Sequence, residues 1–579
     1  MKKLLRYLRA YRKECILAPL FKMLEATFEL MVPLVVRAII DTGIADGNRS
    51  YIIRMCLLMA GLAAIGLTCT LFAQFFAAKA AVGFSARVRR VLMDHIQKLS
   101  YSDLDRLGTS TVITRMTSDV NQIQNGVNMT IRLLLRSPFI VFGAMVMAFT
   151  VDVKGALIFA VAIPLLAVVV FGIMLSTIPM NKTVQDRLDD VTEVTRENLT
   201  GVRVIRAFRT EEAETARFDR RNRALAEMQE KVGRLSAVMN PLTYAMINGA
   251  VIALIAVGAL RVGSGALTRG SVVALYNYMS QILVELIKFA MFLILIPKSF
   301  ACGNRIQSIL DIPVSEDSGL PVPEIAAENR GSVTFSHVSF TYEGGGAPAL
   351  RDITFSAERG EVIGIIGGTG SGKSTLVNLL PRFYEPTEGS ITVDGIDSRE
   401  FPRDALRARI GTVPQKAVLF QGTIRDNMHW GDPDADDAAI YRALEAAQAL
   451  DVVQSKPAGL DEPVAESGHN FSGGQRQRLT IARALVREPE FLILDDSASA
   501  LDYATDAALR RSLRELPGRP TVFIVSQRTA SIRNADRILV LEDGALTGIG
   551  THDELMQSCP VYREIHLSQF PDEEVAADA

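Results

Sequence analysis

Long apolar segments in the first half of the chain most restrict what this sequence can fold into. Each is long enough to cross a lipid bilayer as a helix. They cover about Cys15–Ile40, 53–80, 133–152, 155–179, 240–262 and 271–297. Apolar and aromatic residues make up 49% of the chain, and its mean hydropathy is +0.21, a high value for a protein that stays in water. The first half is therefore predicted to be an all-α, six-helix transmembrane domain.

Charge in the connecting segments indicates how these helices are oriented. The connections near 41–52, 152–155 and 263–270 are short, whereas those at about 81–132 and 180–239 are long and rich in arginine. Basic segments beside membrane helices stay in the cytoplasm. The basic segment Met1–Lys13 follows the same rule. We therefore expect a multi-pass protein of the cytoplasmic membrane with both termini in the cytoplasm.

The two long connections have helical periodicity. Apolar residues recur at helical spacing, as at Val112, Met116 and Val120, and few prolines interrupt them. We expect the membrane helices to continue into the cytoplasm and to reverse direction at short transverse turns, at Tyr101–Gly108 and Gly201–Glu212.

Five charged residues lie inside the predicted membrane helices: Lys22, Glu25, Glu29, Glu285 and Lys288. Glu25 and Glu29 are four residues apart and therefore share one helix face. A bare charge in lipid costs several kcal/mol, so such side chains are expected to face partners or a water-filled cavity. They either line a substrate pathway, form structural ion pairs or lie close to the lipid headgroups.

A glycine-rich loop in the second half predicts a phosphate-binding site. Gly367–Ser374 reads Gly-Gly-Thr-Gly-Ser-Gly-Lys-Ser, follows an apolar strand expected at Val362–Ile366 and opens a helix expected at Ser374–Leu380. In such a loop backbone N–H groups surround the phosphates, Lys373 reaches the β- and γ-phosphates, and the Ser374 hydroxyl binds Mg²⁺. A second apolar strand, Phe491–Leu494, ends at Asp495, which predicts a carboxylate for the same ion.

Further motifs, in the same order, resemble those of the ABC-type ATPases. Phe471–Gln475 resembles their signature motif, Tyr342 their adenine-stacking aromatic residue, Gln415 their Q-loop and Ser499–Asp502 their D-loop. The resemblance covers about residues 330–565 and implies an enzyme that hydrolyses ATP with Mg²⁺. It implies nucleotide contacts from Tyr342, Gly367, Gly368, Thr369, Gly370, Ser371, Gly372, Lys373, Ser374, Thr375, Gln415, Ser472, Gly473, Gly474, Gln475 and Asp502, and metal contacts from Ser374, Gln415 and Asp495.

Two positions depart from the family's pattern. Asp496 stands where the family has the glutamate that activates water, and Gln527 stands where it has the switch histidine. The aspartate is one methylene shorter, and a misplacement near 1 Å can lower a rate about a hundredfold. Gln527 can hydrogen-bond a phosphate but cannot become a cation. One interpretation is that both changes are neutral. The other is that the catalytic set Asp496, Gln527 and Gln415 hydrolyses ATP slowly, and the occurrence of both changes at one site favours it.

The chain is expected to divide into a transmembrane domain at 1–311, a linker at 312–330 and an ABC-type nucleotide-binding domain at 331–579. Three prolines without periodicity indicate the linker at Ile312–Pro323.

The second domain is predicted to be an α/β fold, a parallel sheet with helices on both faces. Short strands at Ser332–Phe335, Val338–Tyr342 and Ile353–Ala357 should precede the sheet. Phe401–Leu460 is expected to be a mostly helical subdomain, and the acidic tail Asp572–Ala579 to be frayed.

The first half resembles the membrane domain of ABC exporters over about residues 1–310. That resemblance makes the transverse turns coupling helices and implies that two ATPase domains close head to tail, with each nucleotide between one P-loop and the opposite signature motif. A chain with one such domain must therefore dimerise. Because the signature is nearly intact while Asp496 and Gln527 are altered, we expect a bacterial heterodimer whose other half-transporter carries the usual glutamate and histidine.

The expected function is export of drugs, lipids or other amphipathic compounds through the membrane. Membrane lipid and a small amphipathic substrate are the expected partners, and a net charge of −2 gives no reason to expect nucleic acid. Two alternatives are a homodimeric lipid or drug exporter in which Asp496 is a sufficient base, and an ATP-gated channel or regulatory subunit that transports nothing.

Overall fold

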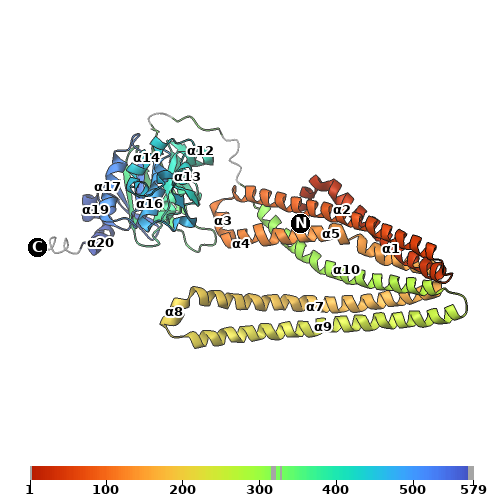
Figure 1. Ribbon diagram of the computed structural model, residues 1–579. Helices are drawn as coiled ribbons and strands as arrows, with labels where there is room; N and C mark the ends of the chain where they lie inside the picture. Colours follow the sequence, from red (N-terminus) through yellow and green to blue (C-terminus); the bar gives the residue numbers. More distant parts are fainter. Residues whose placement is uncertain (1–2, 315–320, 326–328, 571–579) are drawn as a thin grey trace. The chain divides into compact units, whose positions relative to one another are not determined.

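A computed structural model describes residues 3–314, 321–325 and 329–570, which divide into two units (Figure 1). The first unit comprises Met1–Gln97 and Thr109–Pro313, and the second comprises Lys98–Gly108 and Val314–Ala579. The predicted tail Asp572–Ala579 and much of the predicted linker Ile312–Pro323 lie outside the described residues.

The described residues of the first unit form helices joined by turns, without strands, as predicted. Its elements are η1 (Leu4–Tyr11), α1 (Arg12–Ala38), η2 (Ile39–Ile44), α2 (Arg49–Ile96), α4 (Thr109–Thr114), η3 (Arg115–Asp119), α5 (Val120–Leu133), α6 (Arg136–Val151), α7 (Val153–Thr200), α8 (Val202–Ala207), α9 (Glu211–Gly263) and α10 (Arg269–Leu310). Among the described residues, five helical runs are long and apolar enough to cross a membrane: α2, α4 through α6, α7, α9 and α10. The segment predicted as the first span also forms a helix, α1, but Lys22, Glu25 and Glu29 interrupt its apolar stretch, so it is not among these five.

Short polar turns start three of the long helices. Asn48, Asp152 and Thr268 each occupy the N-cap of the helix that follows and accept a hydrogen bond from a backbone N–H three residues further on. Such caps satisfy N–H groups that the first helical turn leaves without a partner. All three caps lie in the connections that are short in the sequence, so these turns fix where α2, α7 and α10 begin.

Both predicted transverse turns are short helices. α3 (Tyr101–Leu107) follows α2, and α8 (Val202–Ala207) follows α7. Ser100 caps α3, and α3 ends at Gly108, whose φ of 72° suits glycine. α8 joins α7 and α9, which run side by side (Figure 1). The prediction of helices that extend beyond the apolar segments and then reverse is confirmed.

Two sheets form the core of the second unit. An antiparallel sheet has the order β2-β1-β4-β5, and a mainly parallel sheet has the order β12-β11-β3-β10-β9-β6. The strands are β1 (Val333–Phe340), β2 (Leu350–Ala357), β3 (Val362–Gly367), β4 (Glu388–Val393), β5 (Ile396–Asp397), β6 (Ile410–Val413), β9 (Phe491–Asp495), β10 (Thr521–Val525), β11 (Arg537–Glu542) and β12 (Ala545–Gly550), with a separate pair β7 (Gly422–Thr423) and β8 (Pro463–Val464).

The α-helices of the second unit are α11 (Lys373–Leu379), α12 (Arg403–Ala408), α13 (Ile424–His429), α14 (Asp437–Ala446), α15 (Leu450–Gln454), α16 (Gly473–Leu485), α17 (Tyr503–Arg514), α18 (Thr529–Ile532), α19 (His552–Ser558) and α20 (Pro560–Gln569). Of these, α11, α12, α16, α18, α19 and α20 contact strands of the parallel sheet, as the α/β prediction required.

Two details of the prediction need correction. The strands expected at Ser332–Phe335 and Val338–Tyr342 are one strand, β1, because the intervening residues form a bulge in which His337 adopts a φ of 50°. The range Phe401–Leu460 is not uniformly a helical subdomain, since it contains β6, which pairs with β9 at the edge of the parallel sheet.

Candidate nucleotide-binding site

The glycine-rich loop lies where β3 meets α11. β3 is a central strand of the parallel sheet, and α11 begins at Lys373, directly after Gly372. Gly372 has a φ of 98°, and a Cβ there would lie 2.7 Å from the Ala349 carbonyl oxygen. A residue with a side chain would therefore be strained and obstructed at this turn. The predicted strand–loop–helix context of the P-loop is confirmed.

The Lys373 side chain points back into the glycine-rich loop. Its Nζ donates to the carbonyls of Gly367 (2.9 Å) and Gly368 (2.6 Å), and the residue is 8% exposed. Burial lowers the pKa of the Lys373 ammonium, and the nearby Asp496 and Asp495 carboxylates oppose that change. The ammonium group is thus a desolvated cation at the centre of the predicted phosphate site.

Ser374 and Asp495, the two predicted Mg²⁺ ligands with the strongest sequence support, are brought together. The Ser374 hydroxyl donates to Asp495 Oδ1 at 2.9 Å, although the two residues are 121 positions apart. Asp495 ends β9, and its neighbour Asp496 has a φ of 48° and lies 3.4 Å from Gln415 Nε2. Hydroxyl, carboxylate and carboxamide oxygens are ligands that Mg²⁺ prefers, so these side chains fit that ion.

Asp495 is expected to make metal-dependent nucleotide binding sensitive to acid. Burial is the main cause that raises the pKa of Asp495, and the neighbouring Asp496 raises it further, against the effects of Ser374 and Lys373. Because the pKa of Asp495 is raised in the folded protein, ionised Asp495 lowers the free energy of unfolding at pH values above this pKa. The loss is absent at pH values below the pKa of an ordinary aspartate. Protonation also removes a metal ligand, so Mg²⁺-dependent ATP binding should weaken on acidification earlier than for an ordinary aspartate.

The variant Asp496→Asn should shift that loss of binding to lower pH, because it removes a charge that raises the pKa of Asp495. The measurement is the ATP affinity of the full-length protein with Mg²⁺ and with EDTA, titrated across the acid range. Asp434→Asn, at an exposed position, is the matched control. Identical pH profiles for wild type and Asp496→Asn would contradict the assignment of the acid-sensitive group.

The predicted adenine-stacking residue is supported by a second tyrosine that the sequence analysis missed. The Tyr342 hydroxyl lies 3.0 Å from Thr375 Oγ1, and its ring meets the Tyr384 ring edge-on at 5.2 Å. Tyr342 remains 39% exposed, so a base can reach it. The Tyr384 hydroxyl donates to Asp105 in α3 (2.6 Å), and burial raises the pKa of Tyr384. Hydrogen bonds and ring contacts therefore connect the nucleotide site with α3.

The signature residues form the start of a helix. Ser472 caps α16, its Oγ accepts from the Gln475 N–H (3.2 Å), and Gln475 Oε1 accepts from the Ser472 N–H (2.9 Å). This reciprocal capping explains the spacing of serine and glutamine. No hydrogen bond among the described residues joins Ser472 or Gln475 to the P-loop. Ser472 is exposed and Gln475 is half-buried, so another chain can reach the start of this helix.

Asp502 and Gln527 differ in what holds them. Asp502 caps α17, and its carboxylate accepts from the Thr505 N–H (2.8 Å) and hydroxyl (3.0 Å). Gln527 lies in the loop after β10 with an exposed side chain, while its carbonyl accepts a hydrogen bond from Gln569. The structure therefore gives Asp502 a structural role as a cap, and it leaves the Gln527 side chain accessible.

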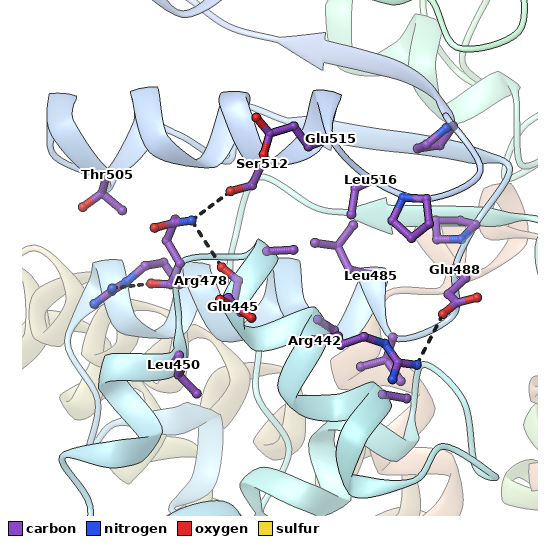
Figure 2. Close-up of a pocket in the computed structure, with 18 of the residues that line it drawn as sticks. Arg442, Glu445, Leu450, Arg478, Leu485, Glu488, Thr505, Ser512, Glu515 and Leu516 are labelled. Atoms are coloured by element: carbon purple, nitrogen blue, oxygen red, sulfur yellow. Dashed lines mark hydrogen bonds and ion pairs between the residues drawn. The ribbon is translucent and has the colours of Figure 1, made fainter.

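A cavity of about 660 Å³ lies apart from these residues, between α14, α15, α16 and α17 (Figure 2). Gln448 Nε2 donates to Ser512 Oγ (3.0 Å) and to the Glu445 carbonyl (3.2 Å), and Arg478 donates to Asp451 (2.7 Å). Among the described residues that line it, none is a predicted nucleotide ligand. The cavity separates α14 and α15 from α17 and is distinct from the nucleotide site.

The first unit contains a buried ion network centred on Arg136, which the sequence analysis missed. Arg136 Nη2 lies 2.8 Å from Glu29 and 3.7 Å from Glu25, and Nη1 pairs with Glu285. Arg136 is 6% exposed and Glu285 is 2% exposed. Lys22 pairs with Glu25 at 2.5 Å, and Lys288 pairs with Glu285 at 2.9 Å. Each of the five charges noted in the sequence therefore has an ion-pair partner, and Arg136 is the partner that links the three glutamates. This pairing supports the expectation of structural ion pairs for the buried charges.

A P-loop ATPase unit in one chain with a bundle of membrane-length helices defines a nucleotide-driven membrane transporter. Two family models match the chain, "ABC transporter transmembrane region" over residues 15–286 and "ABC transporter" over residues 350–499. An uncharacterized ABC transporter ATP-binding protein of Mycobacterium tuberculosis is 36% identical, with 97% of each chain covered. This chain belongs to the ABC transporter family, and its second unit is the family's ATPase.

Two further comparisons concern export. An ATP-dependent lipid A-core flippase of Chromohalobacter salexigens is 30% identical, over 99% of this chain and 98% of the flippase. The solved structure of a bacterial Atm1-family ABC exporter with ATP bound is 25% identical, with a TM-score of 0.78 over 96% of this chain and 97% of that one. The helical unit followed by an α/β ATPase unit is thus the fold of an ABC exporter half.

Proposed function

We propose that this chain is one half of a heterodimeric exporter that moves lipids, drugs or other amphipathic compounds out across the bacterial cytoplasmic membrane. Its own nucleotide site would bind ATP and hydrolyse it slowly. The observation that carries this proposal is the pair Asp496 and Gln527 beside a site that otherwise follows the family's pattern, in which Lys373 donates to the glycine-rich loop and Ser374 donates to Asp495. The similarity to a lipid flippase supports the class of substrate.

In the proposed mechanism the residues of this chain mainly hold the nucleotide. Lys373 and the backbone N–H groups of the P-loop bind the phosphates, and Tyr342 stacks on the base. Ser374, Asp495 and Gln415 hold Mg²⁺, which when bound neutralises charge on the β- and γ-phosphates. The Asp496 carboxylate accepts the proton of the attacking water. It is set back from that water by one methylene, so proton transfer is slow.

The signature helix serves the other half of the dimer. Ser472 and Gly473 are exposed at the start of α16 and would complete the partner's nucleotide site. ATP binding would close the two ATPase domains, and α3 would transmit this closure through Tyr384 and Asp105. Hydrolysis at the partner's site would reset the transporter, while the slow site keeps the domains in contact.

The purified chain alone is expected to hydrolyse ATP at least about tenfold more slowly than the same chain assembled with a half-transporter that carries the glutamate and histidine. The measurement is the steady-state ATPase rate in lipid nanodiscs at equal protein concentration. As a control, changing the partner's glutamate to glutamine should remove the added activity. Fast turnover by the chain alone would favour the homodimeric alternative, in which Asp496 is a sufficient base.

The channel or regulatory alternative is tested by transport. Inside-out vesicles that contain the assembled dimer should accumulate a fluorescent lipid or drug in proportion to the ATP hydrolysed. Hydrolysis without accumulation of any amphipathic probe would contradict the exporter assignment and favour the regulatory role.

A further inference from the structure

The last described helix, α20, contacts the loop Ser526–Thr529, called the switch loop here, through its final residue. Gln569, at the end of α20, donates from Nε2 to the Gln527 carbonyl (2.8 Å), and its Oε1 accepts from the Thr529 N–H (2.9 Å). These two backbone groups flank Arg528, so one carboxamide holds the loop on both sides of that residue. The contact joins positions that are 42 and 40 residues apart in the chain.

A second residue of α20 supports the same contact from a buried position. His566 is 1% exposed, and its Nδ1 lies 3.0 Å from Thr529 Oγ1. The Thr529 hydroxyl in turn lies 3.2 Å from Gln569 Oε1, and Thr529 is fully buried. If this hydroxyl donates to Gln569, its lone pair can accept the Nδ1 proton of His566. The orientation of the Gln569 carboxamide is therefore determined by its surroundings.

The switch loop has other anchors, but they lie on either side of Gln527. The Ser526 N–H donates to the Ile365 carbonyl in β3 (3.1 Å), and the Arg528 N–H donates to Ser526 Oγ (2.9 Å). Arg528 also donates to the Ser499 carbonyl (3.2 Å), which links this loop to the predicted D-loop. Gln569, by contrast, holds the backbone of Gln527 itself.

We propose that Gln569 is a positioning residue of the nucleotide site. By holding the Gln527 carbonyl and the Thr529 N–H, it directs the exposed Gln527 side chain toward the γ-phosphate and keeps Arg528 in reach of Ser499. This inference rests on the proposed role of Gln527 as the switch residue. α20 thereby couples the end of the ATPase unit to nucleotide retention.

The role requires a group that both donates and accepts a hydrogen bond. Gln569→Leu has a similar volume and can do neither. Gln569→Glu keeps an acceptor for the Thr529 N–H but brings a carboxylate oxygen toward the Gln527 carbonyl. Both variants should release nucleotide from this chain about tenfold faster than wild type, because each lost bond alters the loop that holds Gln527. Ser568→Ala, one residue earlier, is the matched control, since that hydroxyl donates to the Ile565 carbonyl within α20.

The experiment follows radiolabelled azido-ATP on the full-length chain, in the dimer that it forms in nanodiscs, during a chase with unlabelled ATP. Photo-crosslinking and a gel show which chain retains the label. Wild type, Gln569→Leu, Gln527→Ala and the double variant are compared. Gln527→Ala should release the label about tenfold faster, and the double variant should match it, because both changes remove the same interaction.

Three outcomes separate the possibilities. Retention in Gln569→Leu within twofold of wild type would overturn the positioning role. So would effects that multiply in the double variant, since Gln569 would then act through another residue. A wild-type rate in Gln527→Ala would instead show that the proposed role of Gln527 is wrong. Thermal unfolding of each variant separates a local effect from loss of fold: Gln569→Leu should unfold cooperatively, at a temperature modestly below that of Ser568→Ala, because the buried Thr529 N–H loses its acceptor.

Discussion

Replacing Arg136 by methionine is expected to lower the free energy of unfolding by about 3 to 5 kcal/mol, the usual result of removing one partner from a buried ion pair. Glu285 is 2% exposed, and without Arg136 its remaining partners among the described residues are Lys288 and the Ser137 hydroxyl, which lies 3.0 Å from Glu285 Oε2. Glu29 would lose the cation that lies 2.8 Å away. The measurement is thermal unfolding of the full-length protein in detergent, with and without added lipid.

Arg234→Met is the matched control for this substitution. Arg234 also pairs with a glutamate, Glu230, at 2.6 Å, but both side chains are exposed, and exposed pairs contribute at most about 1 kcal/mol. The double variant Arg136→Met with Glu285→Gln should recover much of the lost stability, because it no longer buries that unpaired carboxylate. If Arg136→Met unfolds at the same temperature as Arg234→Met, the network does not hold α1, α6 and α10 together.

Arg136 shows what sequence reasoning could not find in the membrane unit. Lys22, Glu25 and Glu29 can be recognised in the sequence because they interrupt an apolar segment. Arg136 lies near the start of the segment predicted at 133–152, where a basic residue is normal at a membrane boundary. Whether such a residue faces headgroups or the bundle interior depends on how α1 and α10 pack around α6. That packing joins segments far apart in the chain, so the local periodicity of each helix does not predict it.

The same reasoning explains which parts of the ATPase unit were predicted correctly. β3 and α11 were predicted within a residue of their observed bounds, because the P-loop between them restricts the backbone on both sides. The contact between Ser374 and Asp495 followed from two strands that end at one edge of a parallel sheet. By contrast, β6 has only four residues, and helices surround it in the sequence, so its place in the sheet could not be predicted.

Residues that support the site from a distance had no local signal. Tyr384 and Gln569 lie outside every motif that resembles the ABC ATPases, and each acts through a contact with a residue far away in the chain. A tyrosine or a glutamine near a helix end is ordinary in any sequence. Motifs therefore identified the residues predicted to touch the nucleotide, while the residues that hold them in place needed the structure.

Restoring the family's residues at both altered positions is expected to raise ATP hydrolysis at this site by about a hundredfold. Asp496→Glu moves the carboxylate one methylene toward the attacking water, and a shift near 1 Å is worth about that factor. Gln527→His adds an imidazole that can carry a proton at neutral pH. Gln415 already lies 3.4 Å from the Asp496 carboxylate, and Ser374 already meets Asp495, so the remaining site needs no rearrangement.

The measurement is a single-turnover rate in a dimer whose partner carries glutamine in place of its catalytic glutamate, so that hydrolysis at this chain's site is observed. Asp434→Glu with Gln454→His is the matched control, because it makes the same two chemical changes at exposed positions of the same unit. Asp496→Glu alone should give most of the increase, since the base takes the proton directly. A double variant as slow as the control would mean that something other than these two side chains limits hydrolysis at this site. The proposed difference in hydrolysis rate between the two sites would then need another physical cause.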